Sequence, residues 1–329
     1  MTICIDMGTS RICALVSGKG VVINEPNLAA IDSYTGEILA FGDALENVKG
    51  RNPASFTVQS SVENGRIVKY DLCEKILKFI INRLCGERVF RPDIRITTHS
   101  GTDDLEERVL RDMLKSCGAR SCEILSEGYC AAMGAGAGYT DKAGTCVLNI
   151  GAGKTDFALV AGGELISSLE VPFGGNLITQ AVQNFAREKK LCEISFDEAE
   201  KLKLQLGSAM PSESDIAFTV SGKDTQSSLP RLCEISNTEL FSVVTECLTP
   251  FTKELRSAFE LIPPEFAEDI DKRGVILTGG CSNLSGISKY LSYALELDTV
   301  LTPEPGLCAV KGLDRSKIRG GLFKAGRHS

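Results

Sequence analysis

The chain alternates short apolar runs with segments of helical periodicity. One segment repeats its apolar side chains at the spacing of a helix face, at Leu72, Ile76, Phe79, Ile80 and Leu84. Predicted helices therefore cover residues 71–84 and 105–117, and short strands that follow them cover residues 94–96 and 122–125. Such alternation is typical of an α/β fold, in which helices cover the faces of a parallel or mixed sheet.

A strand, glycine turn and second strand occur twice in the chain. Ile5–Thr9 leads into Ala14–Gly18, and Leu148–Thr155 leads into Ala158–Gly162. Two copies of one hairpin so far apart predict a duplicated fold with two related lobes that face each other. We expect lobes at 1–140 and 141–329, small inserted subdomains at about 30–65 and 180–240, and a basic C-terminal tail at 315–329.

The second half continues the alternation. Residues 196–206 have a charged helical pattern, and residues 207–229 are rich in Pro, Ser, Asp and Gly, which is typical of loops and edge strands in a small subdomain. A long helix is predicted over residues 237–261. The apolar run Gly274–Gly280 then predicts a buried strand that enters a third glycine turn.

Composition excludes several classes of protein. The net charge is -7 and the basic residues are scattered, which argues against a nucleic-acid-binding surface. The 13 cysteines include no CxxC pair and the chain has only two histidines, His99 and His328, so we expect a reduced cytosolic protein without a zinc site. Most of the cysteines are then expected to be small core residues.

No apolar run reaches the roughly 20 residues that a membrane-spanning helix needs, so any membrane contact is expected to be peripheral. The tail from Arg315 to Ser329 carries five basic side chains and no acidic one, interleaved with Ile318, Leu322 and Phe323. This composition suits an anionic lipid surface. A frayed soluble terminus is the alternative.

Three glycine turns carry the expected chemistry. They are Asp6–Thr9, Asn149–Gly153 and Gly279–Gly280, and each follows an apolar strand. A glycine at this place lets backbone N–H groups approach a phosphate closely because no Cβ intervenes. One such turn is a weak signal, but three, of which two are duplicates, predict a nucleotide site between the lobes.

In its motifs and their order, the chain resembles the MreB family of the actin, heat-shock chaperone and sugar-kinase superfamily. The resemblance runs through VVINEP (21–26), TGEIL (35–39), NGRIVKY (64–70), EGYCAAMGAG (127–136), NIGAGKT (149–155), EKLKLQLG (200–207) and RGVILTGG (273–280). It implies an actin-like ATPase fold with ATP or ADP in the cleft. It also implies a filament-forming cytoskeletal protein for cell shape.

The resemblance assigns site residues by position. It implies that Glu127 orients the attacking water, a role that phosphoryl transfer requires. It implies that Asp6 holds Mg²⁺ through water, that Glu200 and Lys203 face the ribose, and that Thr278, Gly279 and Gly280 line the adenine end. The remaining nucleotide-binding residues are Gly8, Thr9, Ser10, Arg11, Asn149, Gly151, Ala152, Gly153, Lys154, Gly174, Gly175 and Asn176.

The sequence departs from the family at the phosphates. In the second hairpin, Asn149 stands where the family has an aspartate, and Lys154 stands where it has its first threonine. Asn176 replaces the aspartate that follows the Gly-Gly turn. In the first hairpin, Arg11 and Ile12 replace an asparagine and a threonine. Loss of one charge beside a cation removes roughly 3 to 4 kcal/mol at an effective dielectric near 20, so Mg²⁺ binding should weaken. We hypothesise that Arg11 and Lys154 partly replace the metal and that hydrolysis is slow. Alternatively, both side chains point to solvent.

Three functions are compatible with these residues. The first is a nucleotide-gated scaffold that forms filaments with itself on the inner face of the cytoplasmic membrane and binds cell-wall or division proteins. In it Val89 and Phe90 correspond to an apolar pair that enters lipid, although a Phe buried in its own turn is the alternative. The second is a non-hydrolysing partner of such filaments. The third is a small-molecule kinase, which is disfavoured because no further cleft acid offers a base for a substrate hydroxyl.

Overall fold

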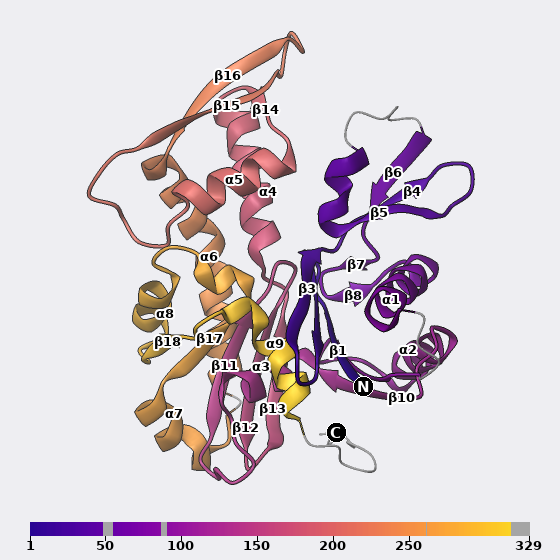
Figure 1. Cartoon of the computed structure of the whole chain (residues 1–329). Coiled ribbons are helices and arrows are strands. Elements are labelled where there is room, and N and C mark those ends of the chain that lie inside the picture. The colour runs from indigo at the N-terminus through magenta and orange to yellow at the C-terminus, as the bar shows by residue number, and fades with distance from the viewer. Residues whose placement is uncertain (49–54, 87–90, 261, 317–329) are drawn as a thin grey trace.

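Two five-stranded mixed sheets form the centres of two lobes in the computed structural model, which describes residues 1–48, 55–86, 91–260 and 262–316 (Figure 1). The first sheet has the order β10 (Ser121–Ser126), β9 (Asp93–Thr98), β1 (Thr2–Met7), β2 (Arg11–Val16) and β3 (Gly20–Pro26). The second has the order β18 (Thr299–Leu301), β17 (Val275–Thr278), β11 (Thr145–Ile150), β12 (Thr155–Ala161) and β13 (Glu164–Val171).

The two sheets have the same topology. In each, the central strand pairs antiparallel with the next strand in the chain, and that strand pairs antiparallel with the following one. On its other side, the central strand pairs in parallel with a strand from much later in the chain. The duplication predicted from the two hairpins is therefore confirmed, and it extends to all five strands of each sheet.

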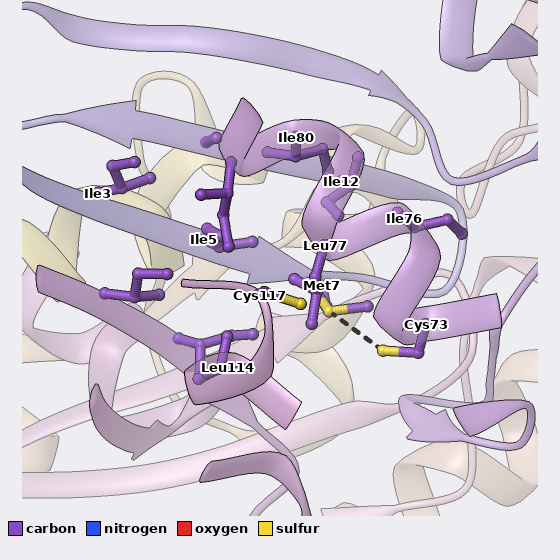
Figure 2. Close-up of a cluster of buried hydrophobic side chains, with 14 of the residues drawn as sticks. Ile3, Ile5, Met7, Ile12, Cys73, Ile76, Leu77, Ile80, Leu114 and Cys117 are labelled. Carbon is purple, nitrogen blue, oxygen red and sulfur yellow. Dashed lines mark hydrogen bonds between the residues drawn. The ribbon is translucent and has the colours of Figure 1, made fainter. Parts of the chain in front are cut away.

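The outer face of the first sheet is covered by α1 (Tyr70–Cys85) and α2 (Asp104–Ser116), which confirms the two helices predicted there. Figure 2 shows Ile3, Ile5 and Ile12 of the sheet facing the buried side chains of both helices. Asp103 closes a capping box with Glu106 at the start of α2. This packing holds the ends of β1 and β2, and hence the first glycine turn, in a fixed place.

In the second lobe, α6 (Asn237–Glu260) packs with α8 (Ile287–Leu295) against the second sheet. The predicted helix over 237–261 is confirmed as far as residue 260; residue 261 lies outside the described residues. A short α7 (Ala267–Arg273) precedes β17, and the helical pattern of residues 196–206 is confirmed as α5 (Phe196–Leu206).

Two short helices lie between the sheets. α3 (Glu127–Ala135) and α9 (Cys308–Arg315) share a buried cluster with apolar side chains from both sheets. A Cβ on Gly134 would lie 1.9 Å from the carbonyl oxygen of Cys308, and a Cβ on Gly312 would lie 1.7 Å from that of Cys130. The two glycines therefore let the helices cross in backbone contact, which joins the lobes at this layer.

Each lobe carries a smaller sheet. That of the first lobe contains β4 (Ala29–Asp32), β5 (Ile38–Phe41) and β6 (Phe56–Gln59), next to the 3-10 helix η1 (Gly42–Val48) and the two-stranded β7 (Val62–Glu63) and β8 (Arg66–Ile67). That of the second lobe contains β14 (Cys192–Glu193), β15 (Ala217–Asp224) and β16 (Pro230–Ser236), next to α4 (Gly175–Lys189) and α5. The short 3-10 helices η3 (Pro264–Phe266), η4 (Gly280–Asn283) and η5 (Pro305–Leu307) complete the described elements.

The interpretation of residues 207–229 as loops and edge strands is wrong for β15, which is the central strand of its sheet. Its polar composition misled the sequence analysis because most side chains of this strand are exposed. The small sheet buries only a few apolar residues, such as Val220, Cys233 and Ile235, against α4 and α5.

The cysteines are buried except for Cys122 and Cys281, which confirms that most of them are core residues. Among the helices in the described ranges, none is both long enough and apolar enough to cross a membrane. Val89 and Phe90, and the tail from residue 317 onward, lie outside the described residues.

Candidate functional site

The two glycine hairpins have the same local geometry. Asp6 pairs with Cys13 across the first hairpin, as Asn149 pairs with Asp156 across the second. A Cβ on Gly8 would lie 2.8 Å from the carbonyl oxygen three residues later, and a Cβ on Gly151 would lie 3.0 Å from the corresponding oxygen. Both turns therefore leave little room for a side chain at the same point, which favours glycine there.

Each hairpin turn is supported by residues that follow the third strand of its sheet. In the first lobe the fully buried Asn27 donates from its side chain to the carbonyl oxygen of Gly8 at 2.8 Å. In the second, the backbone N–H groups at the start of α4 donate to the turn, from Gly175 to Gly151 at 3.0 Å and from Asn176 to Ala152 at 2.8 Å. These bonds fix both turns before any ligand binds.

The third turn contacts the second hairpin directly. Gly279 has a φ of +87°, and a Cβ on it would lie 2.3 Å from the carbonyl oxygen of Ile150. Thr278 Oγ1 donates to Asn149 Oδ1 at 3.1 Å. A Cβ on Gly174 would likewise lie 2.4 Å from the carbonyl oxygen of Ala152. Glycines assigned to the nucleotide thus bring the second hairpin, the Gly279 turn and the Gly174 turn together at the C-terminal end of β11.

Glu127 is the first residue of α3 and has a partner on each carboxylate oxygen. Asn149 Nδ2 donates to Glu127 Oε1 at 2.8 Å. Lys154 Nζ lies 3.2 Å from Glu127 Oε2. Gly128, whose Cβ would lie 3.2 Å from Asp156 Cβ, lets the start of α3 approach β12 this closely. Two residues that depart from the family pattern therefore both bind the expected catalytic carboxylate.

Lys154 is buried within a group of acids. Besides Glu127, its ammonium forms an ion pair with Asp156, and Glu170 Oε2 lies 3.7 Å from it. Burial opposes the charge, but Glu127 and Asp156 raise the pKa of Lys154 above its usual range. Its positive charge is thus balanced by acids of the protein itself.

Arg11 occupies the equivalent backbone position in the first hairpin, but its side chain points elsewhere. Its guanidinium is exposed and donates from Nε to Asn24 Oδ1 on β3 at 2.7 Å. The hypothesis that Arg11 and Lys154 lie at related points around the phosphates therefore requires correction: the backbones are equivalent, but only the Lys154 side chain reaches the acids around Glu127. The residue equivalent to Asn24 in the second hairpin is Glu170, and Lys154 lies near it but binds Glu127 and Asp156 more closely.

Asp6 is buried at the end of β1 and accepts a hydrogen bond from Thr97 Oγ1 at 2.6 Å. Burial and the nearby charge of Glu127 raise the pKa of Asp6 to about 7. Burial also raises the pKa of Asp156 to about 6, against the opposing effect of Lys154. The centre is therefore rich in acids that are costly to ionise together, which a bound cation would relieve.

The two residues assigned to the ribose, Glu200 and Lys203, both lie on α5, and Lys203 contacts α4. Lys203 is buried and its Nζ lies 2.6 Å from Glu200 Oε2, 3.0 Å from Thr179 Oγ1 and 3.1 Å from the carbonyl oxygen of Gly175. Thr9 Oγ1 in the first hairpin accepts from the N–H of Gly65 at 2.8 Å. Ser10 is exposed at the tip of the same turn.

Several polar residues of the centre were missed by the sequence analysis. Asp156 is an acid directly before the apolar buried run Phe157–Val160 of β12, and a buried acid next to such a run is a signal of a polar site that the sequence does carry. The others are Asn27, Thr97, Ser100 and Glu170, whose positions in the sequence carry no motif.

Comparison with known proteins identifies the relatives of this chain. The sequence model described as MreB/Mbl protein matches residues 1–319. Cell shape-determining protein Mbl of Bacillus cereus is 30% identical over 309 residues, covering 94% of this chain and 93% of the relative. Cell shape-determining protein MreB of Escherichia coli is 29% identical over 314 residues, covering 94% and 90%.

Solved structures agree with this relationship. MreB5 of Spiroplasma citri bound to ADP superposes with a TM-score of 0.88 at 28% identity, covering 94% of each chain. The MamK double helical filament has a TM-score of 0.78 at 15% identity, covering 96% of this chain and 98% of that one, which supports the actin-like fold alone. With a family match that spans both lobes, the chain belongs to the MreB/Mbl family of actin-like, cell shape-determining proteins.

Proposed function

We propose that this protein binds ATP and ADP between its lobes and assembles with itself into cytoskeletal filaments that organise cell shape and cell-wall synthesis. The observation that carries the proposal is the pair of equivalent glycine hairpins with Glu127 between them. The S. citri relatives bound to ADP and to AMPPNP support nucleotide as the ligand. The family supports self-association.

In this proposal the open turns hold the phosphates. Gly8, Thr9, Ser10, Gly151, Ala152 and Gly153 cradle them, with Gly174, Gly175 and Asn176 supporting the second turn. Glu200 and Lys203 face the ribose, and Thr278, Gly279 and Gly280 lie at the adenine end. Asp6 would hold a Mg²⁺ ion through water, and the ion would neutralise phosphate charge. We assign no phosphate contact to Arg11, because its side chain is bound to Asn24.

We further propose that hydrolysis is weakened. Glu127 must accept a hydrogen bond from the attacking water to orient it, and Asn149 and Lys154 each bind one of its carboxylate oxygens. The Lys154 ammonium in particular fixes the carboxylate and draws on its negative charge, which makes Glu127 a weaker acceptor for water. The ammonium also stands beside the centre where a metal would bind, and the neutral Asn149 supplies no charge for one. Slow turnover and weak Mg²⁺ affinity follow from the same two substitutions.

The proposed filaments lie at the inner face of the cytoplasmic membrane, where they recruit cell-wall or division proteins. Val89, Phe90 and the basic tail are the proposed lipid contacts, and Arg91 beside them suits anionic headgroups. Co-sedimentation with anionic liposomes tests this with Phe90→Ser and with a chain that ends at Ser316. Loss of binding in either variant supports the assignment, and full binding by a protein that carries both changes contradicts it.

A second function is favoured by the Lys154–Glu127 ion pair. A protein that binds nucleotide but does not hydrolyse it would act as a static partner subunit within filaments of another family member. This alternative differs from a slow ATPase only in turnover, so phosphate release separates the two.

Nucleotide binding and assembly test the proposal together. We expect saturable ATP binding by calorimetry and nucleotide-dependent pelleting above a critical concentration. Gly151→Val should abolish both, because its side chain would fill the turn, whereas Gly138→Ala, at an open site in the interlobe region, should change neither. A wild-type protein that binds no nucleotide, or that never pellets, would refute the proposed function.

A further inference from the structure

Polar contacts connect the lobes along one side of the candidate nucleotide site. Arg66 Nη2 on β8 of the first lobe lies 3.2 Å from Glu170 Oε1 on β13 of the second. Ser100 Oγ, which follows β9 in the first lobe, donates to Asp156 Oδ1 on β12 at 2.8 Å. The buried His99 lies beside them, with its Nδ1 3.8 Å from Glu170 Oε2. None of these residues belongs to a glycine turn.

The turn between β7 and β8 lies across both phosphate hairpins. The N–H of Gly65 donates to Thr9 Oγ1 of the first hairpin. A Cβ on Gly65 would lie 2.2 Å from Lys154 Cε, and a Cβ on Gly153 would lie 2.6 Å from Asn64 Cα. Through this turn, Arg66 is directly linked to the place where the phosphates are proposed to bind.

The two kinds of contact between the lobes differ in strength. At the α3–α9 layer the lobes share a continuous apolar cluster, which separates only at a large cost in buried surface. At the polar contacts they share single hydrogen bonds and one ion pair whose arginine is half-exposed. Opening of the cleft would therefore keep the apolar layer and break the polar contacts.

We propose that Arg66–Glu170 and Ser100–Asp156 form a clasp that holds the lobes closed and limits the rate at which bound nucleotide leaves. The clasp rests on the proposed function, since it requires a nucleotide in the cleft. Release of nucleotide then needs both contacts to break. Separation of the completely buried Asp156 from Ser100 costs more free energy than separation of the partly exposed Arg66–Glu170 pair. Glu170 also lies near Lys154, which binds Glu127, so closure of the two lobes is linked through Lys154 to the position of Glu127.

Displacement of a fluorescent ATP analogue by excess unlabelled ATP measures the release rate. Ser100→Ala should release the analogue about tenfold faster, because it removes a hydrogen bond to a buried charged group. Arg66→Gln should release it about two- to fivefold faster, since its pair is partly exposed to solvent. The matched control is Arg120→Gln, which removes an arginine–aspartate pair within the first sheet alone and should leave the rate unchanged.

The Arg66→Gln, Glu170→Gln and double variants complete the test. If the two side chains act as one contact, the double variant releases nucleotide no faster than the faster single variant. Normal binding with wild-type release rates in both Ser100→Ala and Arg66→Gln would overturn the clasp and leave the proposed function standing. Absence of nucleotide binding to the wild type would overturn the proposed function, and the clasp with it.

Discussion

The crossing of α3 and α9 makes Gly312→Ala a severe test of the packing described above. The added Cβ would lie 1.7 Å from the carbonyl oxygen of Cys130, a backbone atom that no rotamer change can move. To reach an ordinary contact of about 3.3 Å, the helices must separate by roughly 1.5 Å. The buried cluster shared by both lobes would then lose close packing.

Overpacking of this kind costs about 1 to 3 kcal/mol, and occasionally more. Replacement of glycine by alanine inside a helix returns up to about 1 kcal/mol. Because the clash is between two backbones, we expect the upper end of the cost and a net loss of about 2 kcal/mol. At about 2 cal/mol/K of unfolding entropy per residue, a protein of this size loses roughly 3 °C in apparent Tm.

Thermal unfolding followed by circular dichroism measures this loss. Gly138→Ala is the matched control, since its Cβ would meet only Asp141 Cβ at 3.8 Å and its φ is not in the left-handed region. The control should be neutral or slightly stabilised. An unchanged or higher Tm in Gly312→Ala would refute the close crossing of the two helices.

Two further predictions concern the acidic centre. Asn149→Asp replaces the amide that donates to Glu127 with a second carboxylate. The free energy of unfolding without ligand should therefore fall by about 1 to 3 kcal/mol at pH 8. An unchanged midpoint of urea unfolding in Asn149→Asp would contradict this. Asp6 has its pKa raised from 3.8 to about 7, so its stabilising contribution is present below pH 4 and is lost as the pH rises through 7. Asp6→Asn should therefore be more stable than the wild type at pH 8 and show a smaller fall in Tm from about pH 5 to about pH 8; an equal fall in both proteins would contradict the assignment.

Much of the fold follows from local pattern. The two hairpins could be predicted because a glycine after a buried strand leaves a signal within a few residues, and their repetition indicated the duplication. The family motifs located Glu127 and the three turns. The helices α4, α8 and α9 were not predicted, although their buried side chains recur at helical spacing, as at Ile178, Val182 and Ala186 of α4.

Side-chain direction could not be predicted. Arg11 and Lys154 occupy equivalent backbone positions, yet one binds Asn24 on a neighbouring strand and the other enters a buried acidic centre. The difference depends on which acceptors the fold brings near each turn. The clasp residues were invisible for the same reason, because Ser100 and Asp156 meet only when the two lobes are assembled.

We propose that Lys154 and Asn149 restrain Glu127 and so slow hydrolysis. Phosphate release from ATP would be measured for wild-type and Lys154→Thr proteins, above the critical concentration and with Mg²⁺. We expect that ATP binds to both proteins, that the wild type releases phosphate slowly, and that Lys154→Thr releases it at least about tenfold faster. Glu127→Ala should remove this gain. Release by Lys154→Thr that is no faster than that of the wild type, with ATP bound equally well, would contradict it.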